Sequence, residues 1–191
     1  MIIKDAALIR RYGRVPASGA RGFTLVEILC VVALLGIAAT LLIPRMSHLA
    51  DFETEAAVRV IVADITFAQS DAMAHQGGRR VHFESDGRGY RLLFSPFDYD
   101  TDVMEDPIGY QGDRRYIVDF NNDHRFQNIV IDSVSFDGSN NFITFDELGG
   151  PVAADGTSSV GGTIVVSGAN ESFEINVAAF TGRVSVTEVV P

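Results

Sequence analysis

A single apolar stretch near the N-terminus constrains this chain more than any other feature. Residues 23–43 contain only one group that is charged at neutral pH, Glu27. As one helix, these roughly 20 residues are long enough to cross a bilayer. The polar segment before them carries five bases and one acid: Lys4, Arg10, Arg11, Arg14 and Arg21 against Asp5. Because positive charge beside a first hydrophobic segment holds that flank in the cytoplasm, we expect the chain after Pro44 to lie outside.

The carboxylate of Glu27 requires an explanation within such a stretch. A charged side chain in a membrane helix costs about 2.5–3.5 kcal/mol on insertion scales, and residues of this kind are usually paired and functional. The alternative is that Glu27 reaches back to the membrane interface, since it lies near the start of the span. Charge alone leaves both interpretations open.

The residues around Glu27 resemble a known processing site. Gly22-Phe23-Thr24-Leu25-Val26-Glu27, with a base before it and an apolar run after it, is similar to the cleavage motif of type IV prepilins and type II secretion pseudopilins. The resemblance implies that an inner-membrane prepilin peptidase cuts between Gly22 and Phe23 and that Phe23 is then N-methylated. It also implies that Glu27 faces the N-terminal ammonium of a neighbouring subunit in a filament, where each charge compensates the burial of the other.

The resemblance also suggests a division of the chain. Gly36 and Pro44 fall where the family has a helix-loosening glycine and a proline, so a helix bend is expected there. The expected parts are a cytoplasmic leader (1–22), a transmembrane helix half (23–43), an amphipathic helix half (44–76) and a periplasmic β-rich head (77–191).

The amphipathic half is predicted from apolar residues that recur at helical spacing. The expected buried stripe consists of Leu49, Phe52, Ala56, Val60, Ala63, Phe67 and Ala74. Charged residues fall largely on the other faces, namely Asp51, Glu55, Arg59, Asp64 and Asp71. Gln76-Gly77-Gly78 is expected to end the helix, because glycine favours the left-handed conformation found after helix C-termini.

The head is predicted to consist of strands. A turn at residues 86–89 separates two alternating runs, 80–84 and 90–94, which indicates a hairpin. Further strands are expected at 115–120, 129–136, 142–145, 163–167, 172–177 and 183–187, with a long acidic surface loop at 95–113. The fold class is therefore α+β and pilin-like: one long N-terminal helix packed on a mainly antiparallel sheet, or on two sheets.

A second resemblance covers this head. Several segments, taken in order, resemble the minor pseudopilins of the GspH/FimT type: Ala68-Gln69-Ser70-Asp71-Ala72 before Val81-His82-Phe83, the run Ile143 to Gly149, the run Gly162 to Val166, Ile175-Asn176-Val177, and Thr181-Gly182-Arg183-Val184. In some FimT-type pilins a basic C-terminal region binds DNA. Here Arg183 has no basic residue after it, and the formal net charge of the whole chain is −10, which argues against nucleic-acid binding.

Other chemistry finds little support in the sequence. The only cysteine, Cys30, lies in the apolar stretch, so no intramolecular disulfide is expected. The acidic segments 98–106 and 119–123 offer oxygen ligands of the kind Ca²⁺ accepts but lack the full loop signature, so solvated loops are favoured and no cofactor is expected. The four histidines show no metal-ligand spacing, and no Gly-x-Ser-x-Gly elbow is present. We therefore expect the substrate of an enzyme rather than an enzyme.

The sequence leads to one principal hypothesis about function. The chain is expected to be a minor pseudopilin of a type II protein secretion system, resembling the H-type subunit that links the tip of the periplasmic pseudopilus to its shaft. Its expected partners are other pseudopilins, the prepilin peptidase and the inner-membrane assembly platform, and it would be a single-pass inner-membrane protein of a Gram-negative bacterium. The alternatives are a minor type IV pilin in adhesion or motility and, with less support, a DNA-binding minor pilin.

Overall fold

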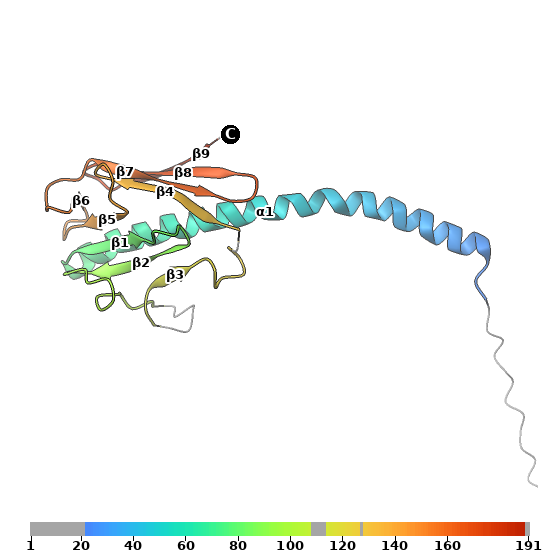
Figure 1. Ribbon diagram of the computed structural model, residues 1–191, viewed down its shortest axis with the longest axis horizontal. Coiled ribbons are helices and arrows are strands. Elements are labelled where there is room, and N and C mark those ends of the chain that lie inside the picture. Colours follow the sequence, from blue (N-terminus) through green and yellow to red (C-terminus); the bar gives the residue numbers. More distant parts are fainter. Residues whose placement is uncertain (1–21, 108–113, 127, 190–191) are drawn as a thin grey trace, which may run out of the picture. The chain divides into compact units, whose positions relative to one another are not determined.

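A computed structural model describes residues 22–107, 114–126 and 128–189, with the backbone alone for residues 40–51. The chain divides into two compact units, residues 1–42 and residues 43–191. We call the described part of the first the N-terminal unit and the second the head. One helix, α1 (Leu25–His75), contributes to both units (Figure 1).

In the part of the chain that the structure describes, nine strands follow α1. They form two antiparallel sheets (Figure 1). The five-stranded sheet has the order β3–β2–β1–β5–β6, with β1 at Arg79–Phe83, β2 at Gly89–Phe94, β3 at Ile117–Asp119, β5 at Phe142–Phe145 and β6 at Pro151–Val152. The four-stranded sheet has the order β4–β7–β8–β9, with β4 at Val130–Phe136, β7 at Gly161–Ser167, β8 at Ser172–Ala178 and β9 at Val184–Val189. The predicted α+β class is confirmed, with two sheets rather than one.

The predicted hairpin is present. Strands β1 and β2 pair antiparallel around the turn, with Val81 opposite Leu92 and Phe83 opposite Tyr90. These four side chains are buried because alternate residues of a strand point to the same face. The strand predicted at 142–145 is β5 with the same bounds. The other predicted strands correspond to β3, β4, β7, β8 and β9 with shifted ends, whereas the two-residue β6 was not predicted.

The head is built around the second part of α1. Its core combines side chains of the helix with inward-facing side chains of both sheets, including Ile61, Ile65, Phe83, Phe145 and Ile164. The helix ends in a Schellman arrangement: the Gly77 N–H donates to the Ala72 carbonyl at 3.1 Å, and Gln76 takes the left-handed conformation with φ of 47°. The predicted end of the helix is correct, although Gln76 rather than a glycine adopts the left-handed conformation.

The predicted buried stripe of α1 is only partly correct: Val60 and Phe67 are half-buried and pack against the core, and the side chain of Leu49 lies outside the described residues. Phe52 is 65% exposed, and Ala56, Ala63 and Ala74 are also exposed. The buried positions are instead Thr54, Ala57, Val58, Ile61, Asp64, Ile65, Ala68 and Ala72. The two stripes lie side by side on the helix and both contain alanines. Helical spacing alone therefore did not distinguish them.

Candidate functional site

The peptide bond predicted to be cleaved lies in an accessible segment. Gly22, Phe23 and Thr24 precede α1 without helical structure, and Phe23 is 76% exposed. A Cβ atom added at Gly22 would meet no other atom within 4 Å. Because the chain itself leaves room for a side chain at position 22, a requirement for glycine there would have to come from the peptidase.

Thr24 and Glu27 form the start of α1. The Thr24 Oγ1 accepts a hydrogen bond from the Glu27 N–H at 3.1 Å, which is the N-cap contact of a capping box. Glu27 lies in the first helical turn, where the positive end of the helix dipole favours a carboxylate. The predicted pairing of Glu27 with a neighbour's N-terminus stays a prediction, and the capping role of Thr24 is an addition that its spacing from Glu27 could have revealed.

The N-terminal unit exposes its apolar side chains. Every described side chain from residue 22 to residue 39 is exposed. The large apolar ones are Phe23, Leu25, Val26, Ile28, Leu29, Val31, Val32, Leu34, Leu35 and Ile37. Among the described residues, no helix combines the length and the hydropathy required to cross a membrane.

The two predicted bend positions both fall inside α1. A Cβ added at Gly36 would meet nothing within 4 Å, so no close helix contact within the described chain explains this glycine. Pro44 also lies within the bounds of α1, and its side chain is outside the described residues. The bend itself stays a prediction.

In the head, three of the segments that resemble GspH/FimT proteins meet at one side chain. Gln69 Nε2 donates hydrogen bonds to the carbonyl oxygens of Gly149 at 2.7 Å and Thr181 at 2.9 Å. Gly182, with φ of 64°, packs so closely that an added Cβ would lie 2.7 Å from Gln69 Nε2. Gln69 therefore holds two loops side by side that are far apart in the sequence. We call this arrangement the Gln69 joint.

The two loops of the Gln69 joint present apolar tips. Asp146 shapes the first loop, because its Oδ1 accepts the Leu148 and Gly150 N–H groups at 3.0 and 2.8 Å. The tip residue Leu148 is 85% exposed, and Phe180 of the second loop is 75% exposed with φ of 63°. A pocket of about 470 Å³ lies between the loops and α1. The exposed tips make this a candidate contact surface.

A buried acid connects α1 to the five-stranded sheet. The hydroxyl of Tyr90 donates to Asp64 Oδ2 at 2.5 Å, and that of Tyr116 donates to Asp64 Oδ1 at 2.8 Å. Burial raises the pKa of Asp64, although both hydroxyls oppose that effect. The predicted position of Asp64 on an outer face of the helix is wrong. Its helical spacing with Ile61 and Ala57 was the signal that could have revealed its inward position.

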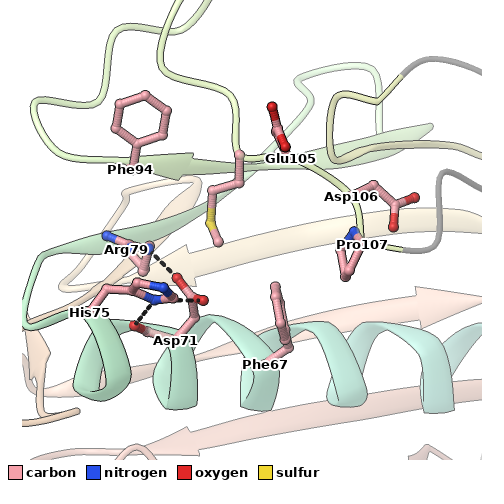
Figure 2. A pocket seen from close by; sticks show the side chains of 9 residues that line it. Phe67, Asp71, His75, Arg79, Phe94, Glu105, Asp106 and Pro107 are labelled. Atoms are coloured by element: carbon pink, nitrogen blue, oxygen red, sulfur yellow. Dashed lines mark hydrogen bonds and ion pairs between the residues drawn. The ribbon is translucent and has the colours of Figure 1, made fainter.

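A second pocket, of about 460 Å³, lies beside the last turns of α1 (Figure 2). Asp71 binds Arg79 Nε at 2.5 Å and His75 Nδ1 at 3.0 Å, while Phe67 and Phe94 line the sides (Figure 2). Because the carboxylate of Asp71 is engaged by two neighbours, the cluster fastens the helix end to the start of β1. It does not resemble a catalytic site.

The acidic segments use their carboxylates in their own turns. Asp98 Oδ1 accepts the N–H groups of Asp100 and Thr101, and these bonds lower the pKa of Asp98. Asp119 Oδ1 likewise accepts the Asn121 N–H at 2.8 Å. Within the described ranges, no three His, Cys, Asp or Glu side chains are grouped to hold a metal ion. The part of the predicted loop at 108–113 lies outside the described residues.

The remaining histidines and Arg183 occupy different surroundings. His82 lies on the outer face of the five-stranded sheet, between the rings of Tyr99 and Phe142 at 5.2 and 6.0 Å. His124 lies in an exposed turn, and the side chain of His48 is outside the described residues. Arg183 is exposed just before β9.

Comparison with known proteins identifies one motif in the sequence. Residues 18–43 match the family model of the prokaryotic N-terminal methylation motif. This match covers the N-terminal segment alone, which therefore carries an N-terminal methylation motif. Among solved structures, the type IV minor pilin FimU of Pseudomonas aeruginosa (strain PAO1) is similar at 13% identity and a TM-score of 0.47, covering 72% of this chain and 90% of FimU. No curated protein matches the sequence significantly.

Proposed function

We propose that this chain is a minor pseudopilin: a structural subunit that prepilin peptidase processes and that joins the periplasmic pseudopilus of a type II secretion system. The observation that carries the proposal is the methylation motif at residues 18–43, placed at the start of a helix that continues into a two-sheet head. The structure supports it further, because the Gly22–Phe23 bond is exposed and lies directly before the first helical turn.

Each part of the chain has a role in this proposal. The apolar residues 23–43 anchor the subunit in the inner membrane and later pack against the helices of neighbouring subunits. Glu27 pairs with the methylated N-terminus of a neighbour, which avoids the cost of an unpaired buried charge and sets the register between subunits. The head contacts other pseudopilins in the periplasm and, as the H-type resemblance implies, links the tip to the shaft.

Mass analysis of the protein from its own membranes tests whether it is a processed, pilin-like subunit. The proposal expects a mature chain that begins with N-methylated Phe23. A chain that keeps its leader in cells with an active peptidase would refute processing, and with it the filament role. Gly22→Leu is the matched negative variant, because it places a bulky side chain before the cleaved bond.

Loss of the gene then tests the system that the subunit serves. A pseudopilin role expects secreted proteins to accumulate in the periplasm while surface pili remain. Loss of pili or twitching with normal secretion would instead assign the chain to a type IV pilus, which the same processing motif permits. Salt-sensitive retention of the purified protein on DNA would favour the DNA-uptake alternative.

A further inference from the structure

The edges of the two sheets differ in how they are protected. An open strand edge presents unpaired N–H and C=O groups, and proteins normally block it with short strands, proline, charged residues, bulges or covering loops. β3 is three residues long, and β6 is two residues long and begins with Pro151. The outer side of β6 is also covered, since the Ser159 N–H donates to the Pro151 carbonyl at 3.1 Å.

The four-stranded sheet has one protected edge, at β4, and one open edge, at β9. The edge of β4 is closed by the turn between β1 and β2, because the Ile131 N–H donates to the Gly87 carbonyl at 2.9 Å. β4 also has an irregular register between Ile131 and Ser133. β9 pairs with β8 over six residues without a shift, and no described strand lies on its other side.

The pairing pattern shows which groups of β9 face outward. The Ala178 N–H donates to the Arg183 carbonyl at 3.0 Å, and these residues continue the register in which Val177 faces Val184. In an antiparallel ladder, hydrogen-bonded and non-hydrogen-bonded pairs alternate. Ser185, Thr187 and Val189 therefore direct their N–H and C=O groups toward β8. Those of Val184, Val186 and Glu188 point to the open edge.

We propose that β9 is a docking edge for β-strand addition, in which an extended segment of a different pilin-like subunit pairs with the outward N–H and C=O groups of Val184, Val186 and Glu188. The inference rests on the proposed filament role, because that role supplies the neighbouring subunit. Only a peptide backbone offers donors and acceptors at the repeat of this ladder, so the edge fits a strand rather than a small molecule.

The side chains of β9 narrow the chemistry of the added strand. Val186 is 43% exposed on one face and Val189 is 39% exposed on the other, so β-branched or aromatic residues opposite them would pack well. Glu188 is exposed near the end of the strand. An acid opposite Glu188 would be repelled, so the added strand should carry a neutral or basic residue there.

A proline at position 186 tests the docking edge in the full-length protein in its own host. Val186→Pro removes one outward N–H and leaves the bonds to β8, since proline is tolerated on edge strands. Val186→Thr is the matched control, because it keeps the N–H and the branched shape. We expect both variants to unfold within about 2 °C of the wild type. The proline variant should be incorporated into filaments at least about tenfold less, and the threonine variant should match the wild type.

Hydrogen exchange gives a readout that does not depend on a variant. In detergent-extracted wild-type protein, the amides of Val184, Val186 and Glu188 should exchange rapidly and those of Ser185 and Thr187 slowly. In the assembled filament the first three should become protected. Equal exchange of the outward amides in both states would overturn the proposal.

Further outcomes separate this inference from the proposed function. A photo-reactive residue at position 188 should cross-link to another pilin-like subunit; cross-linking only to a second copy of this chain would refute the stated partner. If the wild type is processed and incorporated and Val186→Pro is incorporated equally well, the docking edge is refuted while the filament role stands. If the wild type itself is not processed, the proposed function fails.

Discussion

At the scale of single residues, Asp64 has the most demanding surroundings in the head. Its carboxyl group is buried between α1 and the five-stranded sheet, where two tyrosine hydroxyls donate to it. Removing one of these donors should leave the acid less well paired. We expect Tyr116→Phe to reduce the free energy of unfolding by about 1.5–3 kcal/mol, the range for hydrogen bonds to charged groups.

Asp64→Asn should change how stability depends on pH. Burial raises the pKa of Asp64 in the folded protein, so the folded state binds its proton more tightly than the unfolded state does. The contribution of Asp64 to stability is therefore largest at low pH and declines as the pH rises from about 4 through the folded pKa. Denaturant unfolding from pH 4 to 8 should show wild-type stability falling relative to the variant. A constant difference would contradict this assignment.

His82 should change the pH dependence of stability in the opposite direction to Asp64. Burial is the main cause that lowers the pKa of His82, with smaller contributions from Arg80 and Arg91, while Glu84 acts against it. The unfolded chain then binds the proton more readily, so stability is complete above the unfolded pKa and is lost as the pH falls below about 6.5. His82→Gln should reduce the loss of stability between pH 7 and 5. An unchanged pH profile for the variant would show that His82 is not the responsible group.

At the scale of elements, α1 shows where sequence patterns are ambiguous. Alanine occurs both on its buried face, as at Ala57 and Ala68, and on its exposed face, as at Ala56 and Ala63. A small apolar residue fits either environment, so two adjacent stripes satisfied the same helical spacing. The strands were more predictable, because alternation has only two phases and glycine or aspartate marks the turns between them.

The corrected helix face leads to a pair of contrasting substitutions. Ile61→Ala removes a fully buried side chain and should reduce the free energy of unfolding by about 2–5 kcal/mol. Phe52→Ala, at a position that the sequence pattern placed in the core, should change it by less than about 0.5 kcal/mol because Phe52 is exposed. Thermal or denaturant unfolding of the purified proteins measures both. If both variants lost a similar free energy of unfolding, Phe52 would be buried as the sequence pattern predicted.

The candidate sites also differ in whether the sequence could predict them. The N-terminal methylation motif could be predicted because the residues that identify it, Gly22 to Glu27, are consecutive. The Gln69 joint could not, since Gln69 and Thr181 are 112 positions apart and only the packed sheets bring them together. The open edge of β9 also escaped sequence analysis. A strand pattern does not reveal whether the strand has a neighbour on both sides.

At the scale of the whole molecule, processing and assembly should be separable. Glu27→Ala keeps the residues on both sides of the Gly22–Phe23 bond, so cleavage and methylation should continue, whereas incorporation into the filament should fall because the neighbour's ammonium loses its partner. Mass analysis of the N-terminus and the amount of subunit in the filament fraction measure the two steps. Glu27→Gln, which keeps the shape without the charge, is the control. Normal secretion by the alanine variant would refute the assigned role.

The shared helix α1 also has a mechanical consequence. Inward side chains from Thr54 to Ala72 are buried over about five turns of the helix. A force along the axis of α1 would load these contacts together, in shear, instead of peeling them apart one after another. Unfolding under load is governed by the height of the barrier, and breaking many contacts at once makes that barrier high. The two sheets of the head are thus joined to α1 in a way that resists pulling along the helix.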